Sequence, residues 1–265
     1  MSDSTSLSAP ELDALLALAI EATHLAAPVI LRGWRNPSLT FERKSDGSIV
    51  TPLDIEAERV VRAFIAAHQA QPFAVLGEEL GEDPPGDPRA AGYRWVIDPI
   101  DGTLLFARGL TGFGTLLALE ERASARSVLG VIHLPALGET YSAARGRGAW
   151  CGRERLRVAP ERPWPDCIIS LPVTDHARLV RAGAPLPHLR SYADCVAHAM
   201  VARGALDALA EPNLARWDIA ATEVLVAEAG GTVLIRPAAA RRGRYDCILG
   251  SARAAAELER WLGTP

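Results

Sequence analysis

Apolar residues recur at helical spacing in some segments of the chain and form short strand-like runs in others. Leucine, alanine and isoleucine three and four residues apart predict a packing helix over residues 10–33. Residues 39–51 predict two short strands around the turn at Asp46-Gly47. A second helix is predicted over 55–70, because Thr51-Pro52-Leu53-Asp54 places a proline and an acid where helix starts favour them.

The rest of the chain alternates strands with helices. Apolar runs predict core strands over 73–76, 95–98, 115–119, 128–132, 140–143, 167–171, 206–210 and 231–235. Helical patterns cover 175–182, 195–203 and 218–229, and the last is stopped by Gly230-Gly231. A loop over 81–92 and a turn at 120–122 join strands of the first half. This alternation predicts an α/β fold, and the glycines around Trp150 mark a boundary between two halves, 1–145 and 146–265.

The composition narrows the class of partner. Of the 265 residues, 49% are hydrophobic, which is enough for a sizeable core, and the net charge of -4 argues against a nucleic-acid polymer. We therefore expect a small-molecule ligand. The four cysteines form no C-x-x-C pair, which predicts reduced thiols and no disulfide. With no signal-peptide pattern and no apolar run of about 18 residues, we expect no membrane partner and a cytoplasmic protein.

The candidate chemistry lies where the apolar run at residues 95–97 stops at Asp98-Pro99-Ile100-Asp101-Gly102-Thr103. Proline ends a strand ladder, so the two carboxylates stand at a strand end. Both side chains and the Ile100 carbonyl can converge on one hard cation, which takes oxygen ligands. A plain Asp-Gly turn capped by Asp98 is the alternative. The free amides of Gly102 and Thr103 suit a phosphate, and carboxylates beside such amides are what metal-dependent phosphoryl transfer requires.

Other polar residues have a structural and a functional interpretation each. Glu78-Glu79 follows the run at 73–76, although paired glutamates in a loop are usually only solvated. The acids Asp54, Asp194 and Asp218 stand at predicted helix starts, where capping alone explains them. Lys44 lies near the first predicted turn, and Arg241-Arg242-Gly243-Arg244 is typical of a solvated loop.

Together these motifs resemble the inositol monophosphatase superfamily over nearly the whole chain. The resemblance is carried by three blocks in order: Gly77-Glu78-Glu79, Asp98-Pro99-Ile100-Asp101-Gly102-Thr103, and Trp217-Asp218-Ile219-Ala220-Ala221 ahead of Glu228-Ala229-Gly230-Gly231. It implies a layered α-β-α-β-α sandwich, Mg²⁺-dependent hydrolysis of a small-molecule phosphate ester, and a homodimer. The resemblance further implies that a metal-activated water would attack phosphorus, with no covalent enzyme intermediate.

The resemblance also implies roles for particular residues. Two or three Mg²⁺ ions would be held by Glu78, Asp98, the Ile100 carbonyl, Asp101 and Asp218. Thr103 and Asp54 would position and deprotonate the attacking water, with Glu79 beside it. The substrate would contact Asp101, Asp218 and the amides of Gly102 and Thr103. Lys44 matches a lysine of the family's mobile active-site loop.

Three further stretches resemble the histidinol-phosphatase branch: residues 112–119, residues 128–139, and Arg190-Ser191-Tyr192-Ala193-Asp194-Cys195. Because a buried carboxylate needs a cationic or hydrogen-bonding partner, Asp194 and Glu211 suit the ammonium and imidazole of histidinol phosphate. Glu211 matches a substrate-contacting acid in either branch, whereas Asp194 discriminates between them. Leu104-Leu105 and Ala193 depart from the usual pattern. The alternatives are an inositol, sugar or bisphosphonucleotide phosphatase, and a non-catalytic phospholigand-binding module.

Overall fold

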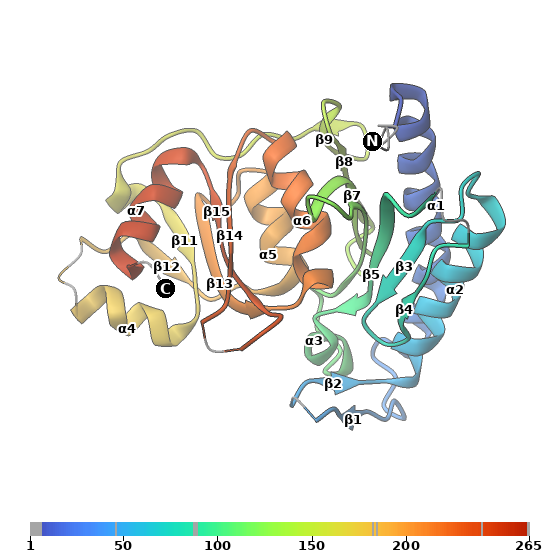
Figure 1. The fold of residues 1–265 in the computed structure, drawn as a ribbon. Coiled ribbons are helices and arrows are strands. Elements are labelled where there is room, and N and C mark those ends of the chain that lie inside the picture. Colours follow the sequence, from blue (N-terminus) through green and yellow to red (C-terminus); the bar gives the residue numbers. More distant parts are fainter. Residues whose placement is uncertain are drawn as a thin grey trace.

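The computed structural model describes residues 7–45, 47–86, 90–181, 183, 185–239 and 241–263. Its central strands are buried almost from end to end, as in β6 (Gly114–Glu121) and β7 (Arg126–Leu134). A sheet that is apolar on both faces requires a helix layer on each side. The chain meets this requirement with alternating layers, α-β-α-β-α (Figure 1), as the sequence predicted.

Within the described residues the first sheet has eight strands in the order β10-β9-β8-β7-β6-β5-β3-β4. Only β3 and β5 pair in parallel; the other described neighbours are antiparallel. Besides β6 and β7 its members are β3 (Ala74–Gly77), β4 (Gly81–Asp83), β5 (Tyr93–Asp101), β8 (Glu139–Ala144), β9 (Gly148–Cys151) and β10 (Glu154–Arg155). A separate hairpin, β1 (Glu42–Arg43) with β2 (Ile49–Val50), confirms the predicted strand pair.

The second sheet has five strands within the described residues, in the order β12-β11-β13-β15-β14. The members are β11 (Ile168–Ser170), β12 (His188–Arg190), β13 (Ala208–Leu214), β14 (Thr232–Pro237) and β15 (Tyr245–Gly250). Strand β11 pairs in parallel with both neighbours, whereas β15 lies antiparallel between β13 and β14. This insertion gives the sheet its mixed character.

Helices α1 (Ala9–Gly33) and α2 (Pro52–His68) cover the outer face of the first sheet and confirm both predicted helices. Contrary to the sequence expectation, α1 is long and apolar enough to span a membrane, with a mean hydropathy of 1.9 over its best window. Glu21, with the polar Thr23 and His24 next to it, interrupts the apolar residues of α1, which is why no continuous apolar run was visible. In the structure its Ala19, Ala22, Ala26 and Ile30 are buried in the core beneath the sheet.

The layer between the sheets contains α5 (Asp194–Ala202) and α6 (Arg216–Glu228), and α4 (Val173–Arg181) and α7 (Ala252–Leu262) cover the far face of the second sheet (Figure 1). The backbone of helix α6 packs directly against β7 at Gly130. A Cβ atom added to Gly130 would lie 2.6 Å from the Ala221 carbonyl oxygen. Glycine at this position therefore sets how near α6, and the residues at its N-terminus, come to the first sheet.

Some local predictions need correction. Residues 81–83 form β4 rather than loop. Glu120 and Glu121 of the predicted turn lie in β6, because both pair with β5 and β7. Strands β9 and β10 extend the first sheet past residue 145. Strands β12 and β15 and helix α7 were not anticipated. Asp46 and the final predicted residue of α4, Ala182, lie outside the described residues.

Candidate active site

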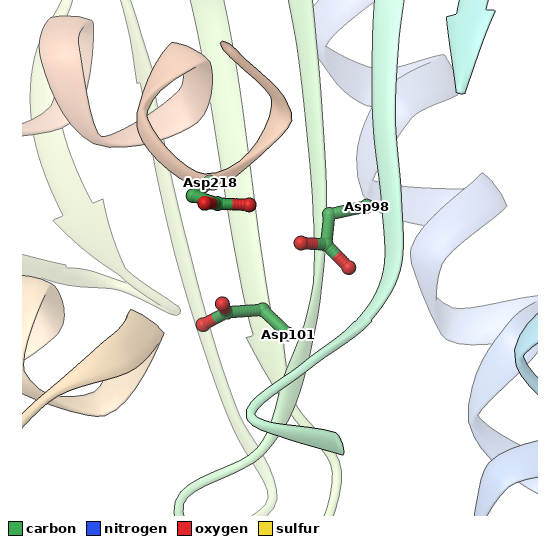
Figure 2. Close-up of side chains that lie close together, drawn as sticks. All are labelled: Asp98, Asp101 and Asp218. Carbon is green, nitrogen blue, oxygen red and sulfur yellow. The ribbon is translucent and has the colours of Figure 1, made fainter. Parts of the chain in front are cut away.

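The end of β5 brings two carboxylates to one side of the first sheet. Asp98 still pairs with Leu116, but the ladder is irregular between Asp98 and Asp101, the segment that contains Pro99. Asp218, in the first turn of α6, faces them across the gap between sheet and helix (Figure 2). One carboxylate oxygen from each of the three aspartates lies within 4.8 Å of the others.

This cluster is electrostatically costly without a cation. Burial first, and then repulsion from neighbouring carboxylates, raises the pKa of Asp98 and of Asp101 well above the ordinary range. Burial is also the main reason why the pKa of Asp218 rises to about 7. Among the described residues, the buried Oδ1 atom of Asp98 has no hydrogen-bond partner. A buried polar atom normally has one, so this set of oxygen donors fits a metal ion.

Glu78 and Glu79 lie at the adjacent strand end, where the Lys44 ammonium joins them. Lys44 Nζ is 2.8 Å from Glu78 Oε1 and 2.6 Å from Glu79 Oε1. Burial alone would lower the pKa of Lys44, but the two carboxylates outweigh it and raise that pKa. Burial raises the pKa of Glu79 to about 7 even though Lys44 opposes the shift. Glu78 lines the same cavity as the aspartates.

Sequence reasoning missed the residue that holds this pair in place, Glu58. It is fully buried on α2, and its Oε2 accepts a 2.8 Å hydrogen bond from the Glu79 amide while Oε1 accepts one of 2.7 Å from Arg62 Nε. A Cβ on Gly77 would lie 1.9 Å from Glu58 Oε1, so a larger residue before the glutamates would displace the Glu58 carboxylate from its hydrogen bonds. The i, i+4 spacing of Glu58 and Arg62 was visible, but such pairs are usually on the surface.

Asp54 and Thr103 meet as the resemblance implied. Asp54 Oδ2 caps α2 by accepting hydrogen bonds from the Thr51 amide and hydroxyl, at 2.8 and 2.6 Å. Its other oxygen, Oδ1, is 3.4 Å from Thr103 Oγ1, which itself donates to the Ile100 carbonyl at 2.8 Å. Burial raises the pKa of Asp54 to about 6. One oxygen of Asp54 therefore serves the helix cap, and the other faces Thr103, so the two interpretations of this residue are compatible.

Gly102 has a left-handed backbone, φ 78°, and precedes the short helix α3 (Thr103–Ala107). A Cβ here would lie 3.3 Å from the Gly112 carbonyl oxygen and 3.5 Å from Asp194 Oδ2. Glycine thus permits both the turn conformation and the close approach of the Asp194 carboxylate.

Asp194 begins α5 with a left-handed backbone, φ 60°, and lines the same cavity as Asp98 and Asp101. Its amide is 3.4 Å from Glu211 Oε1, and the other Glu211 oxygen lies 3.2 Å from His198 Nε2. Burial, and then repulsion from Glu211, raises the pKa of Asp194 to about 6. Glu211 borders a separate, smaller hollow of about 110 Å³. It therefore contacts Asp194 but does not line the cavity that contains the three aspartates.

The cavity has a volume of about 440 Å³. Its wall contains the predicted residues Glu78, Asp98, Ile100, Asp101, Gly102, Thr103, Asp194 and Asp218. Contrary to the interpretation of 241–244 as a solvated loop, Arg241 and Arg244 also line it, together with Arg43. The sequence did not indicate this arrangement. The loop between β14 and β15 reaches the cavity because β15 is inserted antiparallel between β13 and β14, and this strand order could not be predicted from the sequence.

The fold and site define a class of layered α/β phosphatases. The crystal structure of the extragenic suppressor protein suhB from Bartonella henselae matches with a TM-score of 0.83 at 28% sequence identity, covering 95% of this chain and 99% of that one. Such a match over almost both entire chains includes every layer of the sandwich.

The chain belongs to the inositol monophosphatase family, whose model matches residues 11–257. A histidinol-phosphatase from Chlorobaculum parvum is 34% identical over 82% of this chain and 83% of its own length. An inositol-1-monophosphatase from Rhizobium meliloti is also 34% identical, over 82% and 84%. Enzymes of this family are metal-dependent phosphatases, and the acidic cluster can hold a metal ion.

Proposed function

We propose that the protein is a Mg²⁺-dependent phosphomonoesterase that hydrolyses histidinol phosphate to histidinol in histidine biosynthesis, acting as a cytoplasmic homodimer. The choice of substrate rests mainly on the Asp194 carboxylate, which lines the cavity beside Gly102 and is repelled by Glu211. An alkylammonium or imidazolium group of the substrate would neutralise the Asp194 carboxylate, whereas an uncharged polyol would not. The similarity to a histidinol-phosphatase also supports it.

Glu78, Asp98, the Ile100 carbonyl, Asp101 and Asp218 are the residues that would hold Mg²⁺. When bound there, the ion supplies charge neutralisation for the phosphate and lowers the pKa of a coordinated water. All of these ligands are oxygen atoms, and several belong to carboxylates that repel one another, so the set suits a hard cation such as Mg²⁺.

The chain's own groups supply positioning and proton transfer. The amides of Gly102 and Thr103 would orient the phosphate, since they open a helical turn. Thr103 Oγ1 lies 3.4 Å from Asp54 Oδ1, so a small movement would let it donate there and accept a hydrogen bond from the attacking water. Glu79, with a pKa of about 7, is suited to receive the proton of that water at neutral pH.

The second candidate is an inositol, sugar or bisphosphonucleotide phosphatase. It is favoured by Arg43, Arg241 and Arg244 on the cavity wall, because guanidinium groups bind a second phosphate well. The similarity to an inositol-1-monophosphatase supports it equally.

The test is phosphate release from a panel of esters by the wild type and by Asp194→Asn. Asparagine keeps the side-chain shape and tolerates the left-handed backbone of residue 194. We expect histidinol phosphate to be the best substrate of the wild type. Because a hydrogen bond to a charged group contributes about 1.5–3 kcal/mol, the variant should raise KM for histidinol phosphate roughly tenfold or more, with little change for inositol 1-phosphate.

Asp13→Asn is the control, since it removes the same charge from an exposed position on α1. Faster turnover of inositol phosphate or a bisphosphate would overturn the histidinol phosphate proposal in favour of the second candidate. No Mg²⁺-dependent phosphate release from any ester would overturn the enzymatic proposal and leave a phospholigand-binding module.

A further inference from the structure

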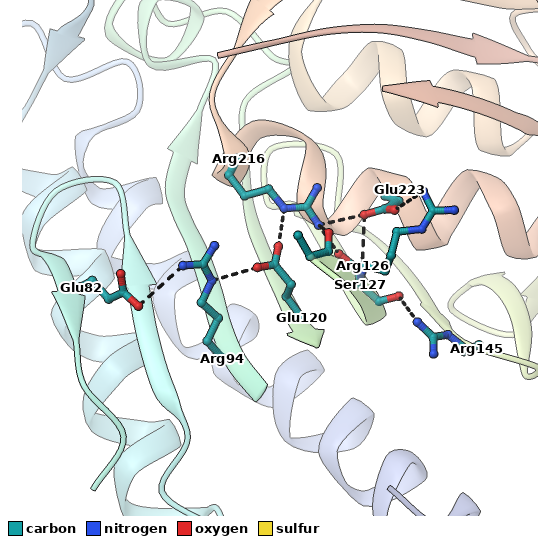
Figure 3. Close-up of polar contacts among 9 residues, drawn as sticks. Glu82, Arg94, Glu120, Arg126, Ser127, Arg145, Arg216 and Glu223 are labelled. Carbon is teal, nitrogen blue, oxygen red and sulfur yellow. Dashed lines mark hydrogen bonds and ion pairs between the residues drawn. The ribbon is translucent and has the colours of Figure 1, made fainter. Parts of the chain in front are cut away.

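A network of charged side chains joins β5, β6, β7 and α6, and two of these elements, β5 and α6, also carry the acidic cluster (Figure 3). Its centre is Arg216, the first residue of α6, whose side chain is only 10% exposed. Arg216 Nε donates to Glu120 Oε2, and Nη2 donates to Glu223 Oε2 at 2.8 Å and to Ser127 Oγ at 3.1 Å. The guanidinium therefore contacts both strands of the β6–β7 hairpin as well as its own helix.

The network continues into the strand that carries Asp98. Glu120 uses its second oxygen, Oε1, to accept a 2.9 Å hydrogen bond from Arg94 Nε. Arg94 stands on β5, four residues before Asp98. Glu223 likewise pairs with Arg126 Nη1 at 3.2 Å. Alternating charges thus connect β5 through β6 to the first residue of α6.

The same two elements carry the repelling carboxylates. Asp98 and Asp101 belong to β5, and Asp218 follows Arg216 by two residues in α6. Like charges within a few ångströms in a buried site drive these elements apart. The attraction of Arg216 for Glu120 acts in the opposite sense across the same interface. Buried ion pairs add little net stability on average, so the effect of this one on the position of α6 matters more than its contribution to the free energy of unfolding.

We infer that Arg216 is a positioning residue for the proposed metal site: its ion pairs with Glu120 and Glu223 fix the first turn of α6 and hold the Asp218 carboxylate opposite Asp98 and Asp101. The inference rests on the proposed function only in so far as the three aspartates bind Mg²⁺. It does not depend on which phosphate ester is the substrate.

The experiment measures Mg²⁺ binding alone, by calorimetry and by the Mg²⁺-induced shift in Tm, on the full chain without substrate. The variants are Arg216→Met, which removes the guanidinium at similar volume, and Glu120→Gln, which removes only one charge. The matched control is Asp207→Asn. Asp207 is also buried and forms an ion pair, with Arg162, but it directly precedes β13 of the second sheet. Arg216→Lys tests partial rescue, because lysine keeps the positive charge but lacks the planar guanidinium that can donate to several acceptors at once.

We expect both network variants to weaken Mg²⁺ binding by about 10- to 100-fold, the range seen for groups that orient metal ligands. The Mg²⁺ affinity of Arg216→Lys should lie between that of the network variants and that of the wild type. Asp207→Asn should lower Tm without weakening Mg²⁺ binding. If Arg216→Met fails to fold, Glu120→Gln decides. Wild-type affinity in a folded network variant would reduce Arg216 to a structural role and overturn the inference. Absence of Mg²⁺ binding in the wild type would instead overturn the proposed metal site and the inference with it.

Discussion

Asp98 shows at the scale of one residue how the site departs from ordinary packing. Its side chain is 1% exposed, and Oδ1 has no partner among the described residues. The ionised form is therefore disfavoured in the folded, metal-free protein. Because the folded state holds the proton more tightly than the unfolded state does, stability falls as pH rises through the raised pKa of Asp98.

Asp98→Asn should therefore separate stability from activity. The amide removes the repelled charge and can donate to the neighbouring carboxylates, so without metal the variant should melt a few degrees above the wild type at pH 8. This advantage should shrink as the pH is lowered, because the wild-type carboxyl becomes neutral. Activity should be lost with the anionic ligand.

Thermal melts between pH 5 and 8 in the presence of a chelator, together with phosphate-release rates, test this. Asp13→Asn is again the charge control. A wild-type rate in Asp98→Asn would contradict the assignment of Asp98 to the metal, and a lower Tm would contradict the repulsion.

Single residues were predictable where a motif named them. Asp98, Asp101 and Asp218 come together as the resemblance implied, and Asp194 joins them in the cavity. Glu58 and Glu120 were not identified, for different reasons. The i, i+4 pair of Glu58 with Arg62 has the pattern of a surface pair, whereas Glu120 pairs with the distant Arg216 and has the same local pattern as a solvated acid. The burial of both acids is set by tertiary packing, which spacing does not encode.

At the scale of elements, the distance between β7 and α6 is the critical dimension. Gly130→Ala would place a Cβ 2.6 Å from the Ala221 carbonyl oxygen and 2.7 Å from its Cα. Backbone atoms cannot rotate away, so α6 must shift. We expect a loss of roughly 1–3 kcal/mol in the free energy of unfolding, the usual range for overpacking, and weaker Mg²⁺ binding because Asp218 moves with the helix.

Urea denaturation and Mg²⁺ titration check this prediction. Gly92→Ala is the matched control, because a Cβ at Gly92 meets no atom within 4 Å and its backbone needs no positive φ. Equal stability of the two variants would show that α6 does not press on β7.

Elements with a long periodic pattern were predicted well, as α1 and α2 show. The pattern missed β10 and β12, strands of two and three residues that exist because a neighbour offers hydrogen bonds. Helix α7 differs: Ala254, Ala255 and Leu258 form a buried stripe that was present in the sequence and was not used.

At the scale of the whole molecule, the cavity lies where the first sheet meets the central helix layer. The ligand set joins β5 to α6, so a bound cation ties the sheet to the helix layer. Binding to the folded state alone stabilises by about 2.7 kcal/mol at one hundred times the dissociation constant. We therefore expect Mg²⁺ to raise Tm and to slow amide exchange at the start of α6 and the end of β5.

Thermal melts and hydrogen exchange with and without Mg²⁺ measure this effect. Asp98→Asn should show neither change. Protection confined to the β1–β2 hairpin, with α6 unaffected, would contradict a metal site shared by β5 and α6.

The layer order was predictable because alternating patterns and the family resemblance agreed. The position of β15 between β13 and β14 was not, since an antiparallel insertion leaves no mark on the apolar pattern. For the same reason Arg241 and Arg244 were assigned to solvent although they line the cavity.

Two of the acids described above also cap helices: Asp54 accepts from Thr51, and Asp218 Oδ2 accepts from the Ala215 amide at 2.7 Å. Each carboxylate thus has one oxygen tied to its own helix and the other directed to the site. Their rotamer entropy is lost when the helices form, not when a ligand arrives. Affinity at this site therefore carries a smaller entropic penalty than free side chains would impose.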